Sequence, residues 1–286
     1  MTKILLTKSA RVATITLNRP EVRNAIDNEV PALLSAAVAE ANADPDVHVI
    51  VLQGAGEAFC AGYDLTYYTS GGGGMQVNQP MPWDPMQDYA FMSRNTEHFM
   101  SLFRSHKPTI AKVHGFAVAG GSDIALCCDF VVMADDADIG YMPARVWGCP
   151  TTAMWVYRVG MEKAKRMMLT GDKIKGPEAE AMGLVLKSVP VDQLDAEVDS
   201  LAKRMATVPV NQLMMQKMVI NQAVEAMGLA ETQRLATVFD GITRHSPEGV
   251  NFLERSADVG WKQAVQARDQ GTFDWTKNRV LPENES

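Results

Sequence analysis

The chain has 286 residues, of which 47% are hydrophobic and 21% charged, and its formal net charge is −7. This composition is typical of a globular protein with ample apolar material for a core. The acidic balance argues against a broad surface for nucleic acid or an anionic membrane, because those partners bind strongly basic faces. The longest apolar stretch, residues 108–128, is interrupted by Lys112, His114 and Asp123, so we expect no membrane span there.

The N-terminus and the cysteines predict a cytoplasmic protein with reduced thiols. Residues 1–12 contain only three consecutive apolar residues between cations, whereas a signal-peptide core needs about 7–15. The cysteines lack the CxxC spacing of a zinc site, and a chain of this length needs no disulfides to build a core. We therefore expect neither a metal site nor a disulfide among Cys60, Cys127, Cys128 and Cys149.

The hydrophobic pattern predicts an α/β fold that opens with a strand, a helix and a strand. Residues 12–17 are β-rich and are followed by Pro20, which cannot continue a ladder. Asp27 can cap a helix whose apolar residues recur at helical spacing until Pro45. Residues 47–53 form a β-branched run that suits a strand buried on both faces.

The middle of the chain predicts a lid, and the C-terminal part predicts helices. Residues 67–88 contain four consecutive glycines, three prolines and Trp83, a composition that suits a mobile inserted loop beside a site. A helix is expected at 89–103, with strands at 109–113 and 130–133. After about residue 160 the pattern is almost entirely helical, with helix boundaries near Gly171, Gly183 and Pro209.

One glycine pair suggests a nicotinamide-binding protein, but the pattern is incomplete. Gly54 and Gly56 follow a strand as in the fingerprint GxGxxG, yet the third glycine position is Phe59. No helical stretch follows directly. We therefore keep a dehydrogenase only as a minor alternative.

Several separate motifs point instead to one known family. FCAGYDL at 59–65 is followed at 114–129 by HGFAVAGGSDIALCCD, and LNRPEVRNAI stands at 17–26. In this order and spacing they resemble the crotonase (enoyl-CoA hydratase/isomerase) superfamily. TGDKIKGPEAEAMGLV at 170–185 is also similar, so the resemblance covers roughly residues 5–210.

The resemblance implies a particular α/β architecture. It is a spiral of repeated ββα units over residues 1–200, which carries the acyl-CoA site and the lid, followed by an α-helical trimerisation region over residues 201–286. It also implies a homotrimer, or a hexamer made of two trimers. The partner expected is an acyl-CoA substrate; CoA arrives as part of that substrate, so no fixed cofactor is implied.

The glycine-rich motifs suit chemistry on a thioester. When such a substrate loses an α-proton or accepts water, negative charge develops on its carbonyl oxygen, and two fixed backbone N–H groups can stabilise that charge. Glycines let the backbone approach the oxygen closely. The resemblance places the donors on Tyr63 and Gly120, and a helix starting near Gly121 would add its dipole.

The acid–base residues depart from the family pattern. Hydratases of the family use two glutamates that flank the reactive carbons. Here the first position is Asp123, which can still move a proton, and the second is Ala144, which cannot. We therefore expect feeble hydration of crotonyl-CoA unless another group substitutes; the candidates near the gap or on the lid are Tyr141, Arg145, Trp147, Cys149, Asp84 and Asp88.

Further residues are implied to bind substrate. The positions expected along the CoA and acyl group are Val22, Arg23, Ala25, Ala61, Asp64, Leu65, Gly121, Ala144 and Trp147. Residues 1–23 carry five basic side chains and one acidic, which predicts a local anion site that includes Arg23. The C-terminal helix at 261–273 adds Arg268 and Phe273 as possible CoA contacts. Alternatives to a hydratase or isomerase are a non-catalytic acyl-CoA-binding homologue and a crotonase-fold hydrolase or dienoyl isomerase.

Overall fold

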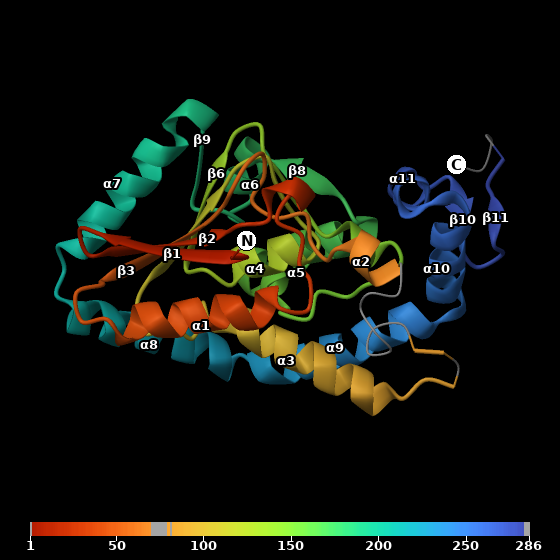
Figure 1. Ribbon diagram of the computed structural model, residues 1–286, viewed down its shortest axis with the longest axis horizontal. Helices are drawn as coiled ribbons and strands as arrows, with labels where there is room; N and C mark the ends of the chain where they lie inside the picture. The colour runs from red at the N-terminus through yellow and green to blue at the C-terminus, as the bar shows by residue number, and fades with distance from the viewer. Residues whose placement is uncertain (1, 70–78, 81, 283–286) are drawn as a thin grey trace.

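A six-stranded sheet forms the centre of the molecule, seen in the computed structural model of Figure 1, which describes residues 2–69, 79–80 and 82–282. The strand order is β1-β2-β3-β4-β6-β9; β1 and β2 pair antiparallel, and every later pair is parallel. Strand β3 is a continuous apolar run because both of its faces are covered. The bounds are β1 (Ile4–Ser9), β2 (Val12–Leu17), β3 (Val49–Gly54), β4 (Thr109–Val113), β6 (Phe130–Ala134) and β9 (Lys187–Val189).

A second, three-stranded sheet lies next to the first and holds a short buried helix. It consists of β5 (Phe116–Val118), β7 (Asp138–Gly140) and β8 (Lys173–Lys175). Helix α4 (Gly120–Leu126) follows β5 directly and packs against it and against β4 and β6. The start of α4 is therefore fixed by both sheets.

Long helices cover the sheets. α1 (Val30–Ala43), α3 (Pro85–Met100), α8 (Val210–Ala226) and α9 (Leu229–His245) run along one side in Figure 1, and α7 (Leu194–Ala206) lies on the other. The remaining helices are α2 (Leu65–Thr69), α5 (Met154–Thr170), α6 (Gly176–Ala181), α10 (Pro247–Val259) and α11 (Trp261–Gln270), and a small hairpin joins β10 (Phe273–Asp274) to β11 (Arg279–Val280).

The α/β class and most predicted elements are confirmed. β2 and β4 have the predicted bounds, and α1 begins at Val30 because the Asp27 carboxylate accepts the N–H groups of Glu29 and Val30. The predicted opening was wrong in one respect: β1 precedes β2, so the chain starts with two strands. The region after residue 160 also contains four short strands, β8, β9, β10 and β11, whose length of two or three residues gives no recognisable alternation.

The two ends of the segment predicted as a lid, residues 67–88, belong to helices. Its first residues belong to α2, which ends at Thr69, and its last ones begin α3 at Pro85. Asp84 caps α3 by accepting the N–H groups of Met86 and Gln87. Residues 70–78 and 81, on which the expectation of a mobile loop chiefly rested, lie outside the described residues. None of the described helices is both long and apolar enough to cross a bilayer.

Candidate active site

A cavity of about 200 Å³ lies where the β3–α2 connection, the start of α4 and the C-terminal helices meet. Most of its lining is apolar or aromatic, which suits an acyl group. The predicted residues Ala61, Tyr63, Leu65, Gly120, Asp123 and Trp147 line it. Charged side chains that share the cavity with Asp123 are Asp240, Arg244, Arg268 and Asp269.

Two tight backbone turns face each other at this cavity. Gly62 and Ala119 both have positive φ, +85° and +51°, and each directly precedes a predicted donor, Tyr63 or Gly120. A Cβ on Gly62 would lie 2.8 Å from the Ala119 Cβ and 3.2 Å from the Gly120 nitrogen. The two turns can therefore approach this closely only because residue 62 has no side chain.

The N–H groups of the two predicted donors are not used within these turns. The bridge between Ile26 and Tyr63 employs the N–H groups of Ile26 and Asp64, so the N–H of Tyr63 takes no part in it. Gly120 is the first residue of α4, and its N–H has no carbonyl partner within the helix. Both backbone N–H groups are therefore available to a ligand. α4 has only seven residues, so its dipole is a small addition.

Asp123 lies one turn into α4 and is 4% exposed. The Thr152 hydroxyl donates a 2.8 Å hydrogen bond to its Oδ1. Burial raises the pKa of Asp123 to about 8, with the negative charge of Asp240 acting in the same direction and the Thr152 hydrogen bond opposing both. At neutral pH this carboxyl group is therefore mostly protonated and able to donate a proton.

Ala144 ends a short 3-10 turn, Met142–Ala144, and packs against the core. It is not among the lining residues of the cavity, although its neighbours Tyr141, Met142, Pro143 and Trp147 are. Trp147 has a φ of +78°, and its ring packs against Phe252 with centroids 5.3 Å apart. The turn thus faces the site without supplying a carboxylate.

A buried acid–base pair from α9 enters the cavity and was not predicted. Asp240 is 5% exposed, and its Oδ1 accepts the backbone N–H of Cys149 at 3.0 Å. Arg244 places a guanidinium nitrogen 3.3 Å from the other oxygen, Oδ2, and hydrogen-bonds to Asp88 of α3. The sequence signal that could have revealed this pair is an acidic and a basic residue four positions apart on one helix.

The other acyl-site candidates have different surroundings. Asp88 is buried in its ion pair with Arg244 and does not line the cavity, nor does Arg145. Burial raises the pKa of the Cys149 thiol to about 12, so it is a poor nucleophile. Gly121 is packed against the Cys60 carbonyl: a Cβ there would lie 2.4 Å from that oxygen.

Of the residues expected along the CoA, Ala61 and Leu65 line the cavity, whereas Val22, Arg23, Ala25 and Asp64 do not. Val22 and Arg23 belong to a 3-10 turn after β2, and Ala25 is buried behind them. Asp64 forms an ion pair with Arg19 at 3.0 Å and accepts the N–H of Tyr67 in α2.

The basic N-terminal segment is largely neutralised within the protein. Lys3, Lys8 and Arg19 are ion-paired. Arg23 is exposed, and the ion pairs of the described residues do not include it. Its guanidinium is therefore accessible to an anionic ligand.

Helix α11 closes the cavity from the same chain. Trp261, Val265, Arg268 and Asp269 all line it. The Arg268 guanidinium donates to Asp269 at 2.7 Å and lies 5.8 Å from the centre of the Phe252 ring. Phe273 is buried next to Trp275 rather than in the cavity.

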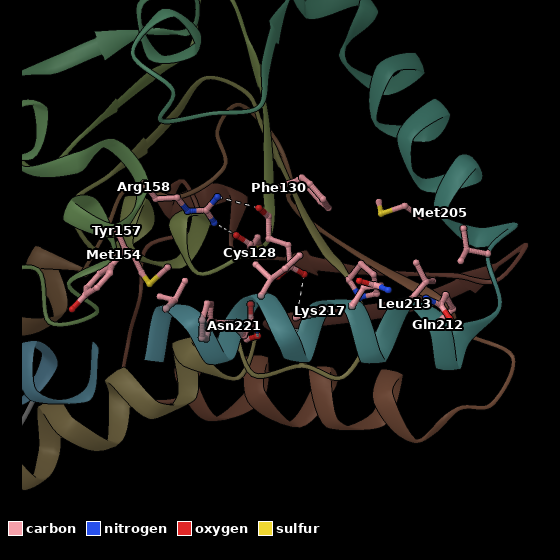
Figure 2. A pocket seen from close by; sticks show the side chains of 17 residues that line it. Cys128, Phe130, Met154, Tyr157, Arg158, Met205, Gln212, Leu213, Lys217 and Asn221 are labelled. Atoms are coloured by element: carbon pink, nitrogen blue, oxygen red, sulfur yellow. Dashed lines mark hydrogen bonds and ion pairs between the residues drawn. The ribbon is translucent and has the colours of Figure 1, made fainter. Parts of the chain in front are cut away.

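A larger cavity of about 410 Å³ lies between α8 and the sheet (Figure 2). Its charged groups are already satisfied: Lys217 is 2.7 Å from Asp129, and Arg158 donates to the carbonyl groups of Leu126, Cys128 and Asp129. The rest of the lining is mainly apolar. It therefore lacks a free proton-transfer group, in contrast to the cavity around Asp123.

Comparison with known proteins agrees with this geometry. The family model for enoyl-CoA hydratase/isomerase matches residues 7–264. The crotonyl-CoA hydratase of Syntrophomonas wolfei is 31% identical over 205 residues, covering 70% of this chain and 74% of the relative. The (E)-benzylidenesuccinyl-CoA hydratase of Thauera aromatica is 34% identical over 208 residues, covering 71% and 76%.

A solved structure extends the likeness over nearly the whole chain. The crystal structure of an enoyl-CoA hydratase from Mycobacterium smegmatis is 46% identical, superposes with a TM-score of 0.89 and covers 95% of this chain and 94% of its own. The family model spans most of the chain, including both glycine turns and Asp123. The protein therefore belongs to the enoyl-CoA hydratase/isomerase, or crotonase, family of enzymes.

Proposed function

We propose that this enzyme binds an acyl-CoA thioester and stabilises the enolate formed from it, in a hydratase or isomerase type of reaction. The observation that carries the proposal is the meeting of the Tyr63 and Gly120 turns with the buried carboxyl group of Asp123 in one cavity. The two backbone N–H groups would hold the thioester oxygen, and Asp123 would exchange a proton with the adjacent carbon. Removing one such donor typically lowers the rate by ~10²–10³-fold.

The CoA portion would leave the cavity along the turn after β2. Val22, Arg23, Ala25, Asp64 and Gly121 lie beside this exit by resemblance, and main-chain contacts would account for most of them. Arg23 is exposed and free of the ion pairs that occupy Lys3, Lys8 and Arg19. Its guanidinium would contact a phosphate of CoA.

The test separates chemistry from binding. Exchange of the α-protons of butyryl-CoA in deuterated buffer, followed by mass spectrometry, reports enolate formation without requiring water addition. Asp123→Asn should abolish this exchange while the affinity for butyryl-CoA, measured by calorimetry, stays within a few-fold. Exchange that continues in Asp123→Asn would contradict the assignment, and an inactive wild type that binds butyryl-CoA would favour the non-catalytic alternative.

A reciprocal variant checks the binding arm of the same experiment. Arg23→Glu should weaken CoA affinity and leave the exchange rate at saturation unchanged. The loss should be larger at low salt, because screening weakens interactions between exposed charges. Lys203→Glu, which makes the same change of charge on an exposed residue of α7, is the control. Equal effects of the two variants would contradict a phosphate contact by Arg23.

We also propose that the protein assembles as a homotrimer, or as a hexamer of two trimers. The supporting observation is that large apolar side chains are exposed on the C-terminal helices. On α8 and α9 these are Met215, Met218, Val219, Ile220, Leu235, Val238, Phe239 and Ile242. Such a concentration on neighbouring helices is typical of a surface that another subunit covers.

A further inference from the structure

We propose that Asp240 is the second catalytic carboxylate, which activates water in place of the glutamate that Ala144 lacks. The inference rests on the acyl-CoA function proposed above and assigns the reaction to hydration of an enoyl-CoA. It concerns a residue of α9, far along the chain from both glycine motifs, that the sequence did not single out.

Asp240 lies in the same cavity as Asp123 and next to the chain segment that contains Ala144. Asp240 and Asp123 line the same cavity, from α9 and α4 respectively. The Asp240 carboxylate is anchored by the Cys149 N–H, which belongs to the segment that follows Ala144. A carboxylate therefore stands beside the chain segment in which the family pattern would place one, although it comes from a different helix.

One of the two carboxylate oxygens of Asp240 can accept a hydrogen bond from a ligand. Its Oδ1 is held by Cys149, whereas Oδ2 is buried and has no hydrogen-bond partner among the described residues. The Arg244 nitrogen 3.3 Å away provides charge compensation. A buried acceptor without a hydrogen bond is costly, and a bound water that donates to Oδ2 would supply one.

A purely structural role as the counter-ion of Arg244 explains less. Asp88 already supplies a direct hydrogen bond to Arg244 from α3, and it is 1% exposed. Asp88 does not line the cavity, whereas Asp240 does. If pairing with Arg244 were the sole requirement, the second carboxylate would not need to face the substrate.

The electrostatic surroundings favour a division of roles. Burial raises the pKa of Asp240, while the positive charge of Arg244, the Cys149 N–H and His245 oppose that rise. No cation lowers the pKa of Asp123, so Asp123 more readily keeps its proton, whereas Asp240, beside Arg244, more readily ionises. The titratable and charged groups that act on or respond to Asp240 are Arg244 and His245 on α9, Asp88 on α3, Asp123 on α4, and Tyr63, Tyr141 and Cys149.

The proposed hydration adds water across the C=C bond of the enoyl-CoA. Water forms a C–O bond to the β-carbon of the enoyl-CoA and gives its proton to the Asp240 carboxylate. The electron pair of the C=C bond forms a double bond between the α-carbon and the thioester carbon, and the carbonyl π pair moves to the oxygen, held by the N–H groups of Tyr63 and Gly120. Protonated Asp123 then delivers its proton to the α-carbon, which yields the 3-hydroxyacyl-CoA. Transfer of the proton from Asp240 to solvent and uptake of one by Asp123 restore the starting state.

The experiment compares Asp240→Asn with a matched variant of the same ion-pair cluster, Asp88→Asn. Hydration of crotonyl-CoA and cinnamoyl-CoA is measured alongside α-proton exchange of butyryl-CoA. Loss of a general base typically lowers the rate by ~10²–10⁴-fold. We expect Asp240→Asn to lose hydration by this factor in kcat, with KM and α-proton exchange nearly unchanged. Asp88→Asn should retain both reactions far better.

The outcomes are distinguishable. Absence of α-proton exchange in the wild type contradicts the acyl-CoA function itself. Exchange without hydration of either substrate by the wild type overturns the role of Asp240 alone, as does an equal loss of hydration in the Asp240 and Asp88 variants. If Asp240→Asn does not fold, the wild-type pH profile decides: kcat/KM for hydration must fall at low pH as the base is protonated, and a flat acidic limb would overturn the proposal.

Discussion

Asp123 shows how a single buried residue combines function with a penalty in stability. Its carboxyl group is enclosed by α4 and by the chain that carries Thr152, and burial raises its pKa to about 8. In the unfolded chain the same group would ionise near pH 4. The native state therefore binds a proton that the unfolded state has already lost over most of the neutral range.

This difference predicts a pH-dependent gain in stability for Asp123→Asn. At Asp123 the folded state keeps a proton that the unfolded state loses between pH ~4 and the raised pKa near 8, so the contribution of this residue to stability falls as pH rises through this interval. Asparagine cannot ionise, and it can still accept the Thr152 hydrogen bond. The melting temperature of the variant should therefore exceed that of the wild type by a margin that widens from pH 5 to pH 8 and then levels off.

A control isolates the buried site from the other titrating groups. Asp192→Asn makes the same change of charge at an exposed position in the short turn before α7. Differential scanning calorimetry of the three proteins at several pH values measures the effect. A margin for Asp123→Asn that stays constant with pH, or shrinks as pH rises, would show that Asp123 is not protonated in the native state.

Among the individual residues of the site, the sequence predicted those that lie in short local motifs. Tyr63, Gly120 and Asp123 belong to two short glycine-rich segments, and the structure brings these segments together. Asp240 belongs to a helix near the other end of the chain, and it reaches the cavity that Asp123 lines through the packing of α9 against α3 and its hydrogen bond from Cys149. The absence of a carboxylate at residue 144 could be read from the sequence, but its proposed replacement could not.

The two turns before Tyr63 and Gly120 act together as one element. Each contains a residue with positive φ, and the close approach of Gly62 to Ala119 sets their separation. The strain at Ala119, which is not glycine, is held by its N–H bond to the Gly140 carbonyl and by Ser122, whose N–H and hydroxyl both donate to the Ala119 carbonyl. Displacing either turn should therefore move a backbone donor.

Gly62→Ala is expected to remove most of the activity. The new Cβ would lie 2.8 Å from the Ala119 Cβ and 2.9 Å from the Val118 carbonyl oxygen, so the two turns must separate. Loss of one oxyanion donor lowers kcat by ~10²–10³-fold. Gly183→Ala is a matched control, because Gly183 has a similar φ of +81° but a Cβ there meets nothing within 4 Å.

The comparison separates backbone strain from donor geometry. Both variants should be destabilised by about 1 kcal/mol or more from the positive φ. Only Gly62→Ala should lose α-proton exchange of butyryl-CoA. Comparable activity in the two folded variants would contradict the idea that the spacing of the turns controls the reaction.

The helices and strands also differ in how well their position and bounds can be predicted from the sequence. β2 and β4 were predicted with the observed bounds, since they are β-branched runs with clear ends. β1 was missed because three apolar residues are followed by three polar ones, without the alternation of a half-buried strand, and it is stabilised by its antiparallel pairing with β2. The division at residue 200 into a core and a helical region stays a prediction.

On the scale of the whole molecule, the exposed apolar surface is unevenly distributed. Large hydrophobic side chains with more than half of their surface exposed cluster on α8, whereas the opposite helix α7 exposes mainly charged ones. The cavity under α8 in Figure 2 widens this apolar region. A monomer would leave it in contact with water, which is unfavourable by roughly 25 cal/mol for each Å² of apolar area that a partner could cover.

The homotrimer therefore predicts a selective effect of charge on α8. Val219 is 70% exposed in the single chain, and Val219→Glu would place a carboxylate in the proposed interface. Sedimentation equilibrium should give three or six times 31.3 kDa for the wild type and a reduced mass for this variant. Val191→Glu makes the identical substitution at a position that is 56% exposed but lies outside α8 and α9, so it should retain the wild-type mass. A wild type that sediments as a single chain, or an unchanged mass in Val219→Glu, would show that α8 does not hold the subunits together.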